Sequence, residues 1–189
     1  MCGKYHISTE DENISFREAI AQLMLEHPEI TLQTRDVVPS QLAPVYTKAG
    51  LAPLRFGRKV DFMSRLLINA RSETAHSSRM FAPLLRTSRV LVPAQAFYEW
   101  SPQKKPHLFA REDGQMLYMA GLAFPGEGLD DFVILTRDSV GRPSEVHPRM
   151  PVMFGSDELR QAWLEQDNLA QALLLLEDET RYIDCQQAG

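Results

Sequence analysis

The segment Arg89-Val90-Leu91-Val92-Pro93 and the segment Ala96-Phe97-Tyr98-Glu99-Trp100 that follows it decide the fold class of this chain. Both are rich in β-branched and aromatic residues, which favour strands. Further strands are expected over residues 107–111 and 116–123, and the dipeptide Asp113-Gly114 between them predicts a β-hairpin. The middle of the chain is therefore predicted to form β-sheet.

Helical patterns lie on either side of this strand-rich region. Near the N-terminus, Ser15 and Glu18 form a capping box, and apolar residues behind it recur with helical spacing at Phe16, Ala19, Ile20, Leu23 and Met24. Ser156 predicts the cap of a helix near the C-terminus. Because strands and helices do not alternate strictly, we predict an α+β fold. No repeat or long linker divides residues 1–189, so we expect a single domain.

Composition limits the class of protein further. The chain has 189 residues, of which 44% are hydrophobic, and can bury a substantial core. Its cysteines, Cys2 and Cys185, do not form a disulfide framework and no metal-ligand spacing occurs, so we expect no metal and no cofactor. The apolar run Leu173–Leu176 is far too short to span a bilayer, and the polar N-terminal region does not resemble a signal peptide. We expect a cytoplasmic monomer that does not bind membranes.

The net charge of −5 is spread unevenly. Residues 1–30 hold two basic and six acidic side chains, and residues 156–189 hold two basic and eight acidic ones. Residues 55–89 reverse this balance with eight basic side chains, seven of them arginine, against two acidic ones. Arginine suits bidentate contact with phosphate, so the segment favours a nucleic-acid partner. An ordinary solvated surface is the alternative.

The second residue of the chain carries a distinctive chemical possibility. Removal of Met1 would leave Cys2 with a free α-amine and a thiol on the same residue. These groups ordinarily titrate near about 8 and about 8.5, so both are partly nucleophilic at neutral pH. The amine can condense with an aldehyde to an imine, and the thiol can then close a five-membered ring. A cysteine placed there by chance is the alternative.

Three polar residues elsewhere also attract attention. Glu99 lies between Tyr98 and Trp100 and faces the opposite way from both if the strand alternates, which would favour a raised pKa and acid–base chemistry. A surface-facing glutamate is equally consistent with the pattern. His147 is held in a rigid segment before Pro148, where a hydrogen-bonded structural histidine is the alternative. Asn69 supplies an amide donor and acceptor.

Four segments in this order resemble the motifs of the SRAP (SOS response-associated peptidase) family: Met1-Cys2-Gly3, Asn69-Ala70-Arg71-Ser72-Glu73-Thr74, Phe97-Tyr98-Glu99-Trp100 and His147-Pro148-Arg149-Met150-Pro151. The resemblance covers most of the chain. It implies a mixed, bifurcated β-sheet with a barrel-like centre surrounded by helices. It also implies a protein of the DNA damage response whose partner is single-stranded DNA. Such a protein senses abasic sites in this DNA and crosslinks to them through a thiazolidine. Such a protein would be nucleoid-associated when bound to DNA.

The resemblance also implies roles for individual residues. Cys2 matches the nucleophile, and Asn69 matches the asparagine that positions the N-terminus and the sugar. Glu99 matches the carboxylate that transfers protons and assists strand cleavage or crosslink reversal. His147 matches the histidine that helps to open the sugar ring. Four basic residues match the DNA-binding positions, with a lysine where arginine is usual: Arg71, Arg79, Arg149 and Lys4.

The sequence departs from the family pattern in several places. The segment before Asn69 lacks the usual tryptophans, so Phe62, with Phe56, is the candidate for stacking on bases. Pro148 replaces an aspartate of the histidine motif, and Gln95-Ala96 replaces Asp-Gly before the strand that carries Glu99. The chain is thus predicted to be a divergent member of the family.

Two other functions are consistent with these residues. Cys2, His147 and Glu99 could form a thiol peptidase that acts once on its own N-terminus. Alternatively, the chain could be a non-catalytic module that binds single-stranded DNA and has kept only the fold. The intact mass of the purified protein would show whether Met1 is removed, as covalent capture through the amine requires.

Overall fold

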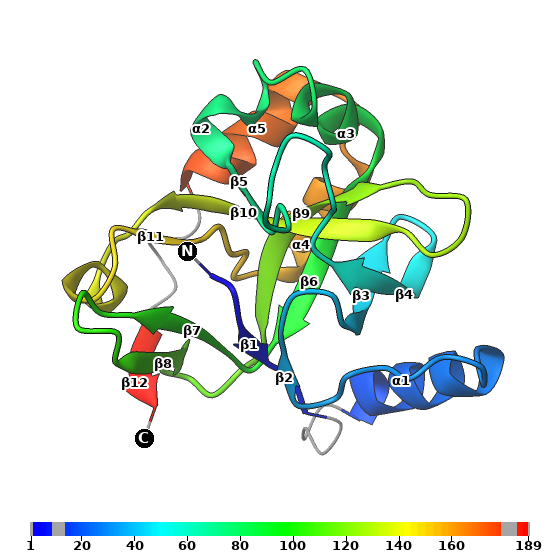
Figure 1. The fold of residues 1–189 in the computed structure, drawn as a ribbon, viewed down its shortest axis with the longest axis horizontal. Helices are drawn as coiled ribbons and strands as arrows, with labels where there is room; N and C mark the ends of the chain where they lie inside the picture. Colours follow the sequence, from blue (N-terminus) through cyan, green and yellow to red (C-terminus); the bar gives the residue numbers. More distant parts are fainter. Residues whose placement is uncertain (1, 9–13, 179–184, 189) are drawn as a thin grey trace.

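The computed structural model describes residues 2–8, 14–178 and 185–188, which form two β-sheets with helices around them (Figure 1). The smaller sheet has the strand order β12-β8-β7-β1-β2. Its strands are β1 (Tyr5–His6), β2 (Asp36–Val37), β7 (Ala96–Trp100), β8 (Pro106–Arg111) and β12 (Cys185–Ala188). The larger sheet comprises β3 (Leu42–Thr47), β4 (Gly50–Phe56), β5 (Asn69–Arg71), β6 (Arg89–Ala94), β9 (Leu117–Phe124), β10 (Asp131–Asp138) and β11 (Arg149–Pro151).

The larger sheet closes into a ring because β10 pairs along both of its edges. On one edge its first residues pair in parallel with β4, and residues 134–136 pair in parallel with β5. On the other edge it pairs antiparallel first with β9 and then with β11. The ring runs through β10, β4, β3, β6 and β9, and branches at β10 into β5 and β11. The predicted mixed α+β fold with a barrel-like centre is confirmed.

The predicted hairpin around Asp113-Gly114 is wrong. The dipeptide does form a turn, in which Gly114 adopts φ +71° and Asp113 accepts a hydrogen bond from the backbone N–H of Gln115. However, β8 pairs with β7 and β12, whereas β9 pairs with β6 and β10 in the other sheet. Most residues of β9 are buried and suit the centre of the ring, but β8 is largely half-exposed. The chain therefore changes sheet at this turn, as it also does at Gln95 between β6 and β7.

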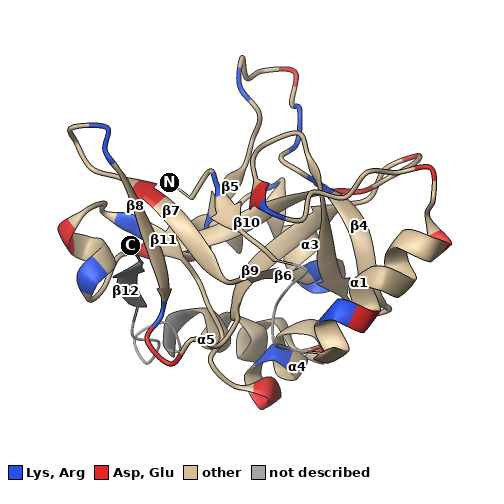
Figure 2. Ribbon diagram, turned by 90° about the horizontal axis from the view of Figure 1, so that it is seen from below, with Lys and Arg blue, Asp and Glu red and all other residues tan. Residues whose placement is uncertain are grey.

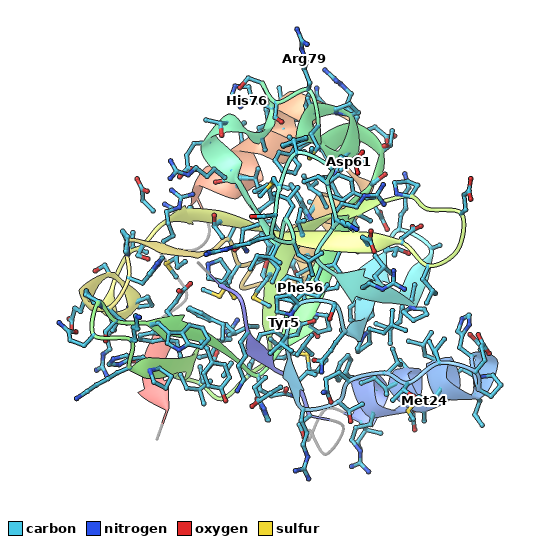
Figure 3. All side chains as sticks on the ribbon, viewed as in Figure 1. Tyr5, Met24, Phe56, Asp61, His76 and Arg79 are labelled. Carbon is cyan, nitrogen blue, oxygen red and sulfur yellow. The ribbon has the colours of Figure 1, made fainter. Side chains whose placement is uncertain are left out.

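The helices of the described residues cover the sheets from several sides (Figure 1). They are α1 (Ile14–Glu26), α2 (Ser72–Ala75), α3 (Phe81–Thr87), the 3-10 helix η1 (Arg142–Glu145), α4 (Asp157–Glu165) and α5 (Leu169–Asp178). The predicted N-terminal helix is present and buries Phe16, Ile20 and Leu23, but Met24 points to solvent (Figure 3). Because α1 already includes Ser15, that residue is not its cap, contrary to the prediction. Ser156 does cap α4, since its side chain accepts from the N–H of Leu159.

The two sides of the molecule differ. Viewed from below, α4 and α5 lie on one side of the sheets, while the N-terminus lies on the opposite side (Figure 2). The loop after β4 and the loop between β7 and β8 project on that same side and carry lysine and arginine residues. Charged loops therefore flank the beginning of the chain.

Arg89 is buried, so its charge does not contribute to the surface but stabilises the packing of two helices against β6. Its guanidinium donates to the carbonyl oxygens of Leu85 and Trp163, each at 2.5 Å, and to that of Gln166. These carbonyls lie at the C-terminal ends of α3 and α4, where the helix dipole favours a cation. Burial lowers the pKa of Arg89. Arg89 thus links the C-terminal ends of α3 and α4 to the start of β6.

Replacing Arg89 tests this structural role. Arg89→Met keeps most of the side-chain volume but leaves three carbonyls without their donor, so it should lower the free energy of unfolding by about 2–4 kcal/mol. Urea denaturation measures the change. Arg86→Met, at an exposed position on α3, is the matched control and should change stability by less than about 0.5 kcal/mol. Equal effects of the two substitutions would contradict the capping role.

Candidate functional site

Cys2 and Asn69 meet although 66 residues separate them in the chain. The side-chain Nδ2 of Asn69 donates to the backbone oxygen of Cys2 at 3.2 Å and lies 3.4 Å from the oxygen of Ile134. Asn69 is held in place because its backbone pairs with Ile134 at the branch of β10. The Cys2 side chain is buried, and its thiol donates to the backbone oxygen of Lys4 at 3.9 Å. The first residues are therefore fixed by side-chain and backbone contacts before β1 begins.

Glu99 and His147 lie together beside this segment. Glu99 is fully buried in β7, while Trp100 on the other face is 36% exposed, so the alternation predicted for this strand is present. The Oε2 of Glu99 lies 3.5 Å from the Nδ1 of His147. That same nitrogen lies 2.9 Å from the backbone oxygen of Arg149 and 3.1 Å from its backbone nitrogen. The imidazole is thus held by the start of β11.

Burial changes the acid–base properties of both buried groups. It raises the pKa of the Cys2 thiol well above the usual value, and the nearby Glu99 carboxylate raises it further. Burial also raises the pKa of Glu99, while His147 acts in the opposite direction. Burial and Glu99 therefore both disfavour ionisation of the Cys2 thiol in the folded protein, an effect that the sequence-based expectation of a partly ionised thiol did not include.

Lys4 lies on the other face of the N-terminal segment, in a cluster around Asp36. Its Nζ is 2.7 Å from the carboxylate of Asp36 and 4.3 Å from the ring centre of Tyr98. The Tyr98 hydroxyl donates to the same carboxylate at 3.2 Å, and His6 Nδ1 lies 3.0 Å from it. The hydrogen bond to Asp36 raises the pKa of Lys4. No sequence pattern pointed to Asp36, because its role depends on the pairing of β1 with β2 and β7.

Arg149 is bound by acidic side chains. It makes a bidentate pair with Glu73 at 2.7 and 2.8 Å, and also contacts Asp138 at 2.6 Å. The Arg149 hydrogen bond lowers the pKa of Glu73. Glu73 belongs to one of the sequence motifs, but no contact was predicted for it. A phosphate at Arg149 would have to compete with these two carboxylates.

The basic segment 55–89 is less uniform than its charge count predicted. Arg89 is buried in the fold and contributes nothing to a surface, so its inclusion was wrong. Arg55 and Arg58 both pair with Asp131, at 3.6 and 3.1 Å. The remaining basic residues are exposed: Lys59, Arg65, Arg71, Arg79 and Arg86. The surface keeps a positive excess, but a smaller one than the sequence indicated.

The remaining candidate residues for DNA contact lie at the surface, except Phe56, which is fully buried, so its candidacy for stacking on bases was wrong. Arg71 is exposed at the end of β5, directly after the strand residues that hold Cys2. Arg79 lies between α2 and α3, and its side chain points away from the molecule (Figure 3). Phe62 is 78% exposed on the loop after β4. An aromatic side chain so fully exposed has no packing role, which is consistent with a contact surface.

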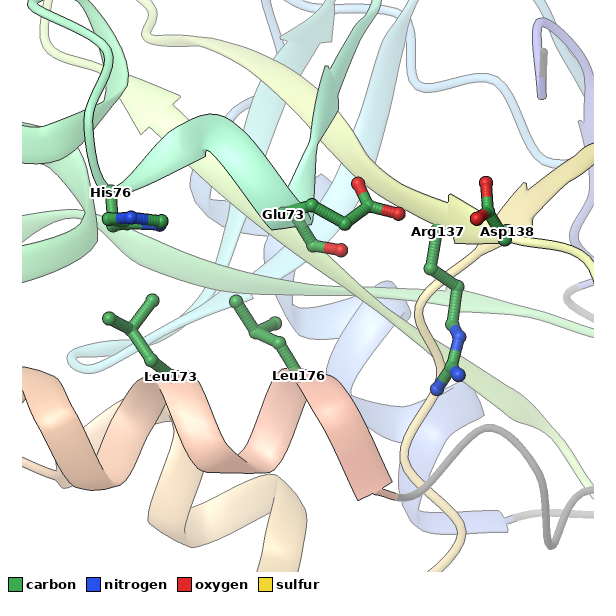
Figure 4. A pocket seen from close by; sticks show the side chains of 7 residues that line it. Glu73, His76, Arg137, Asp138, Leu173 and Leu176 are labelled. Atoms are coloured by element: carbon green, nitrogen blue, oxygen red, sulfur yellow. The ribbon is translucent and has the colours of Figure 1, made fainter.

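A cavity of about 420 Å³ lies close to the Arg149 cluster (Figure 4). Leu173 and Leu176 project into it from α5, opposite Glu73 and His76. The described residues that line this cavity do not include the candidate catalytic residues Cys2, Asn69, Glu99 and His147. Within the described part of the chain, no group of three or more His, Cys, Asp or Glu side chains is arranged to hold a metal ion. Over the same residues, no helix is long and apolar enough to cross a membrane.

The fold and site define a mixed α+β protein in which the backbone of a buried cysteine at the second residue accepts a hydrogen bond from an amide, near a carboxyl group that pairs with an imidazole. The sequence matches the profile of the SOS response associated peptidase (SRAP) family over residues 1–187, and the chain belongs to this family. The resemblance seen in the motifs is confirmed.

Several named relatives are similar to this chain. "Abasic site processing protein YobE" of Bacillus subtilis is 30% identical over 189 residues, covering 89% of this chain and 84% of the relative. "Abasic site processing protein YedK" of Escherichia coli is 33% identical over 108 residues, covering 53% of this chain and 48% of the relative. The chain thus matches about half the length of YedK. HMCES of Gallus gallus, also named an abasic site processing protein, is 31% identical over 147 residues and matches over 61% of this chain and 43% of its own length.

Solved structures share the fold at low sequence identity. The crystal structure of a phage-related protein from Bordetella bronchiseptica has a TM-score of 0.74 at 23% identity, covering 99% of this chain and 94% of that one. A protein from Bacteroides thetaiotaomicron has a TM-score of 0.75 at 18% identity, covering 100% of this chain and 92% of that one. These similarities establish the fold alone.

The raised pKa of Glu99 predicts how stability depends on pH. The fold favours protonated Glu99, so its contribution to stability is complete below the unfolded pKa of about 4.3 and is lost as the pH rises through the folded value. Glu99→Gln removes this titration, so its stability relative to the natural protein should increase as the pH rises from about 4.3 through the raised pKa of Glu99 in the folded protein. The gain should be about 1.4 kcal/mol for each tenfold change in the protonation equilibrium. Urea unfolding over this range measures it, and a difference independent of pH would contradict it.

Proposed function

We propose that this protein processes abasic sites in single-stranded DNA by forming a covalent bond through Cys2. The names of its relatives support abasic sites as the substrate class. The single observation that carries the proposal is the hydrogen bond from Asn69 Nδ2 to the Cys2 backbone oxygen. It fixes Cys2, which would become the N-terminal residue on removal of Met1, near the Glu99 carboxyl group that pairs with His147, so that an aldehyde could meet amine, thiol and proton carrier together.

The proposed reaction uses both nucleophiles of Cys2 once Met1 has been removed. The α-amine adds to the aldehyde carbon of the ring-opened sugar, and the resulting carbinolamine loses water to give an iminium ion. The thiol sulfur then adds to the iminium carbon, the C=N electron pair moves to nitrogen, and the thiol proton is released. The product is a thiazolidine, with one water formed for each adduct.

Glu99 and His147 suit the proton transfers in this sequence. Burial raises the pKa of the Glu99 carboxyl group, which favours its protonated form, so Glu99 could protonate the carbinolamine oxygen and later accept the thiol proton. His147 lies between Glu99 and the start of β11, partly exposed, where it can open the sugar ring by proton transfer at the ring oxygen. Reversal of the crosslink, or cleavage of the strand, would use the same groups in the opposite direction.

A phosphate track on the N-terminal side would deliver the DNA. Exposed Arg71 follows Asn69 closely, and Phe62 projects from the loop after β4 as a base-stacking side chain. Arg79 extends the track, while Lys4 and Arg149 would join it by exchanging their carboxylate partners for phosphate. Phosphate contacts of this kind give affinity without sequence preference.

The peptidase alternative is less well supported by the site. A peptidase nucleophile needs a thiolate, and burial together with Glu99 holds the pKa of the Cys2 thiol high. The proposed ring closure is less demanding, because an iminium carbon is far more electrophilic than a peptide carbonyl. We therefore favour covalent capture of an aldehyde over cleavage of a peptide bond as the function of this site.

Covalent capture is tested with an oligonucleotide that contains one abasic site. The protein should form a heat-stable adduct on a denaturing gel, and Cys2→Ala should abolish it. Cys2→Ser should give at most a weaker adduct, since oxygen closes the ring less readily than sulfur. Cys185→Ala is the matched control and should react like the natural protein. An adduct that depends on Cys185 and survives Cys2→Ala would contradict the assignment.

The phosphate track predicts a salt dependence. Affinity for undamaged single-stranded DNA should fall linearly on a log–log plot against salt, with a slope of roughly −0.7 for each phosphate contact. Arg71→Ala and Arg79→Ala should each reduce the slope by about that amount, whatever the DNA sequence. Phe62→Ala should weaken binding with little change in slope, because stacking releases no counterions.

Arg160→Ala serves as the control for this series. Arg160 pairs with Asp157 on α4, on the side away from the N-terminus, and its replacement should leave the slope unchanged. Fluorescence anisotropy at several salt concentrations provides the measurement. If affinity is independent of salt, the exposed arginines are only a solvated surface.

A further inference from the structure

The residues around β1 separate into a buried set and an outward-facing set. Tyr5 lies in the centre of the molecule (Figure 3) and is fully buried, whereas Lys4 and His6 on either side of it are partly exposed. Asp36 pairs with His6 across β1 and β2, and the N–H of Tyr98 in β7 donates to the backbone oxygen of Lys4. Because side chains alternate along a strand and paired residues share a face, four polar side chains lie on one face of the smaller sheet. We call them the Asp36 cluster: Lys4, His6, Asp36 and Tyr98.

The carboxylate of Asp36 accepts from three donors in this cluster. The Nζ of Lys4 lies 2.7 Å from one of its oxygens. The Nδ1 of His6 and the hydroxyl of Tyr98 lie 3.0 and 3.2 Å from the other. Burial disfavours the charged form of Asp36, but the hydrogen bonds outweigh it and lower the pKa of this carboxyl group. Asp36 is therefore ionised at neutral pH, and its negative charge cancels the positive charge of Lys4.

Lys4 is the basic residue of the described chain that stands nearest to Cys2 in the sequence. The Cys2 thiol contacts the backbone oxygen of Lys4 at 3.9 Å, and two residues of extended chain span at most about 7 Å. A phosphate next to a sugar bound at Cys2 would therefore lie within reach of the Lys4 side chain. That side chain is 27% exposed and thus open to a phosphate from solvent, but in the free protein the Asp36 carboxylate already occupies its ammonium group.

We propose that Asp36 is a specificity-determining residue that neutralises Lys4 in the free protein and so weakens binding to undamaged single-stranded DNA, an inference that rests on the proposed function. Lys4 contributes to binding only when a phosphate displaces the carboxylate. The exchange is feasible because water screens an ion pair this exposed, so the pair contributes little to stability. His6 and Tyr98 still donate to Asp36 after Lys4 has left, so the exchange leaves no carboxylate without a partner. DNA held covalently at Cys2 keeps its phosphate in place for this exchange, whereas an undamaged strand does not.

Asp36→Asn tests this role because it removes the charge and keeps the size of the side chain. The variant should bind undamaged single-stranded DNA at least about threefold more tightly at low salt, and its log–log salt slope should steepen by up to about 0.7, the contribution of one further phosphate contact. Fluorescence anisotropy measures both. Asp157→Asn, which removes a carboxylate that pairs with Arg160 on the side away from the N-terminus, is the matched control and should change neither. Unchanged or weaker binding by Asp36→Asn would overturn the proposal, since weaker binding would mean that Asp36 positions Lys4 for phosphate.

A Lys4→Met background separates release of Lys4 from simple repulsion between Asp36 and DNA. Without the ammonium group there is no further phosphate contact to gain, so adding Asp36→Asn should leave the salt slope nearly unchanged. If Asp36→Asn steepens the slope equally in both backgrounds, the carboxylate acts on DNA directly, and the role assigned to it is wrong.

A second measurement does not depend on DNA. The hydrogen bond to Asp36 raises the pKa of Lys4, and only the unprotonated amine reacts with an acetylating reagent. In Asp36→Asn, acetylation of Lys4 by acetic anhydride should therefore be at least about twofold faster relative to exposed Lys104, as measured by mass spectrometry of peptides. An unchanged ratio would overturn the restraint of Lys4 by Asp36. If the natural protein forms no adduct with abasic DNA, the proposed function fails, whereas acetylation still decides whether Asp36 restrains Lys4.

Discussion

The pairing of β10 along both edges is the constraint on which the structure depends. Its first half closes the ring against β4 and β9, and its second half holds β5 and β11 on opposite edges. Asn69 begins β5, and the segment that ends with His147 leads directly into β11. A shift of this register by one residue would reverse the faces of both strands. The amide and the imidazole would then no longer face the cysteine segment.

The second organising feature is the dry environment of the cysteine. A thiol with a raised pKa is a poor general nucleophile, so a site of this kind discriminates against substrates that an ordinary thiolate would attack. In the proposed reaction an aldehyde would avoid this problem, because the amine would react first and create a strongly electrophilic carbon beside the sulfur. Burial also raises the pKa of the Glu99 carboxyl group, which suits the proton transfers proposed for it. The same low polarity would therefore favour the proposed reaction over its competitors.

Much of the architecture could be predicted from sequence, but its long-range pairing could not. β-Branched and aromatic composition located the strands around Glu99, yet the signal at Asp113-Gly114 defined only a turn and not which sheet each flanking strand would join. A charge count included Arg89 because counting cannot detect burial. The motifs identified Asn69, Glu99 and His147, whereas the cluster around Asp36 depends on β1, a strand of two residues with no pattern of its own.

The place of β1 in the smaller sheet has a consequence for the order of events during synthesis. Tyr5 has its strand partners at Val37 and Phe97, so β1 cannot take its final position until Phe97 has left the ribosome. At about 5–20 residues per second, this interval is on the order of 5–20 s. Cys2 is buried in the folded protein, and before β1 pairs it is not yet enclosed. The late completion of the sheet would thus leave a period for the removal of Met1 that the proposed reaction requires.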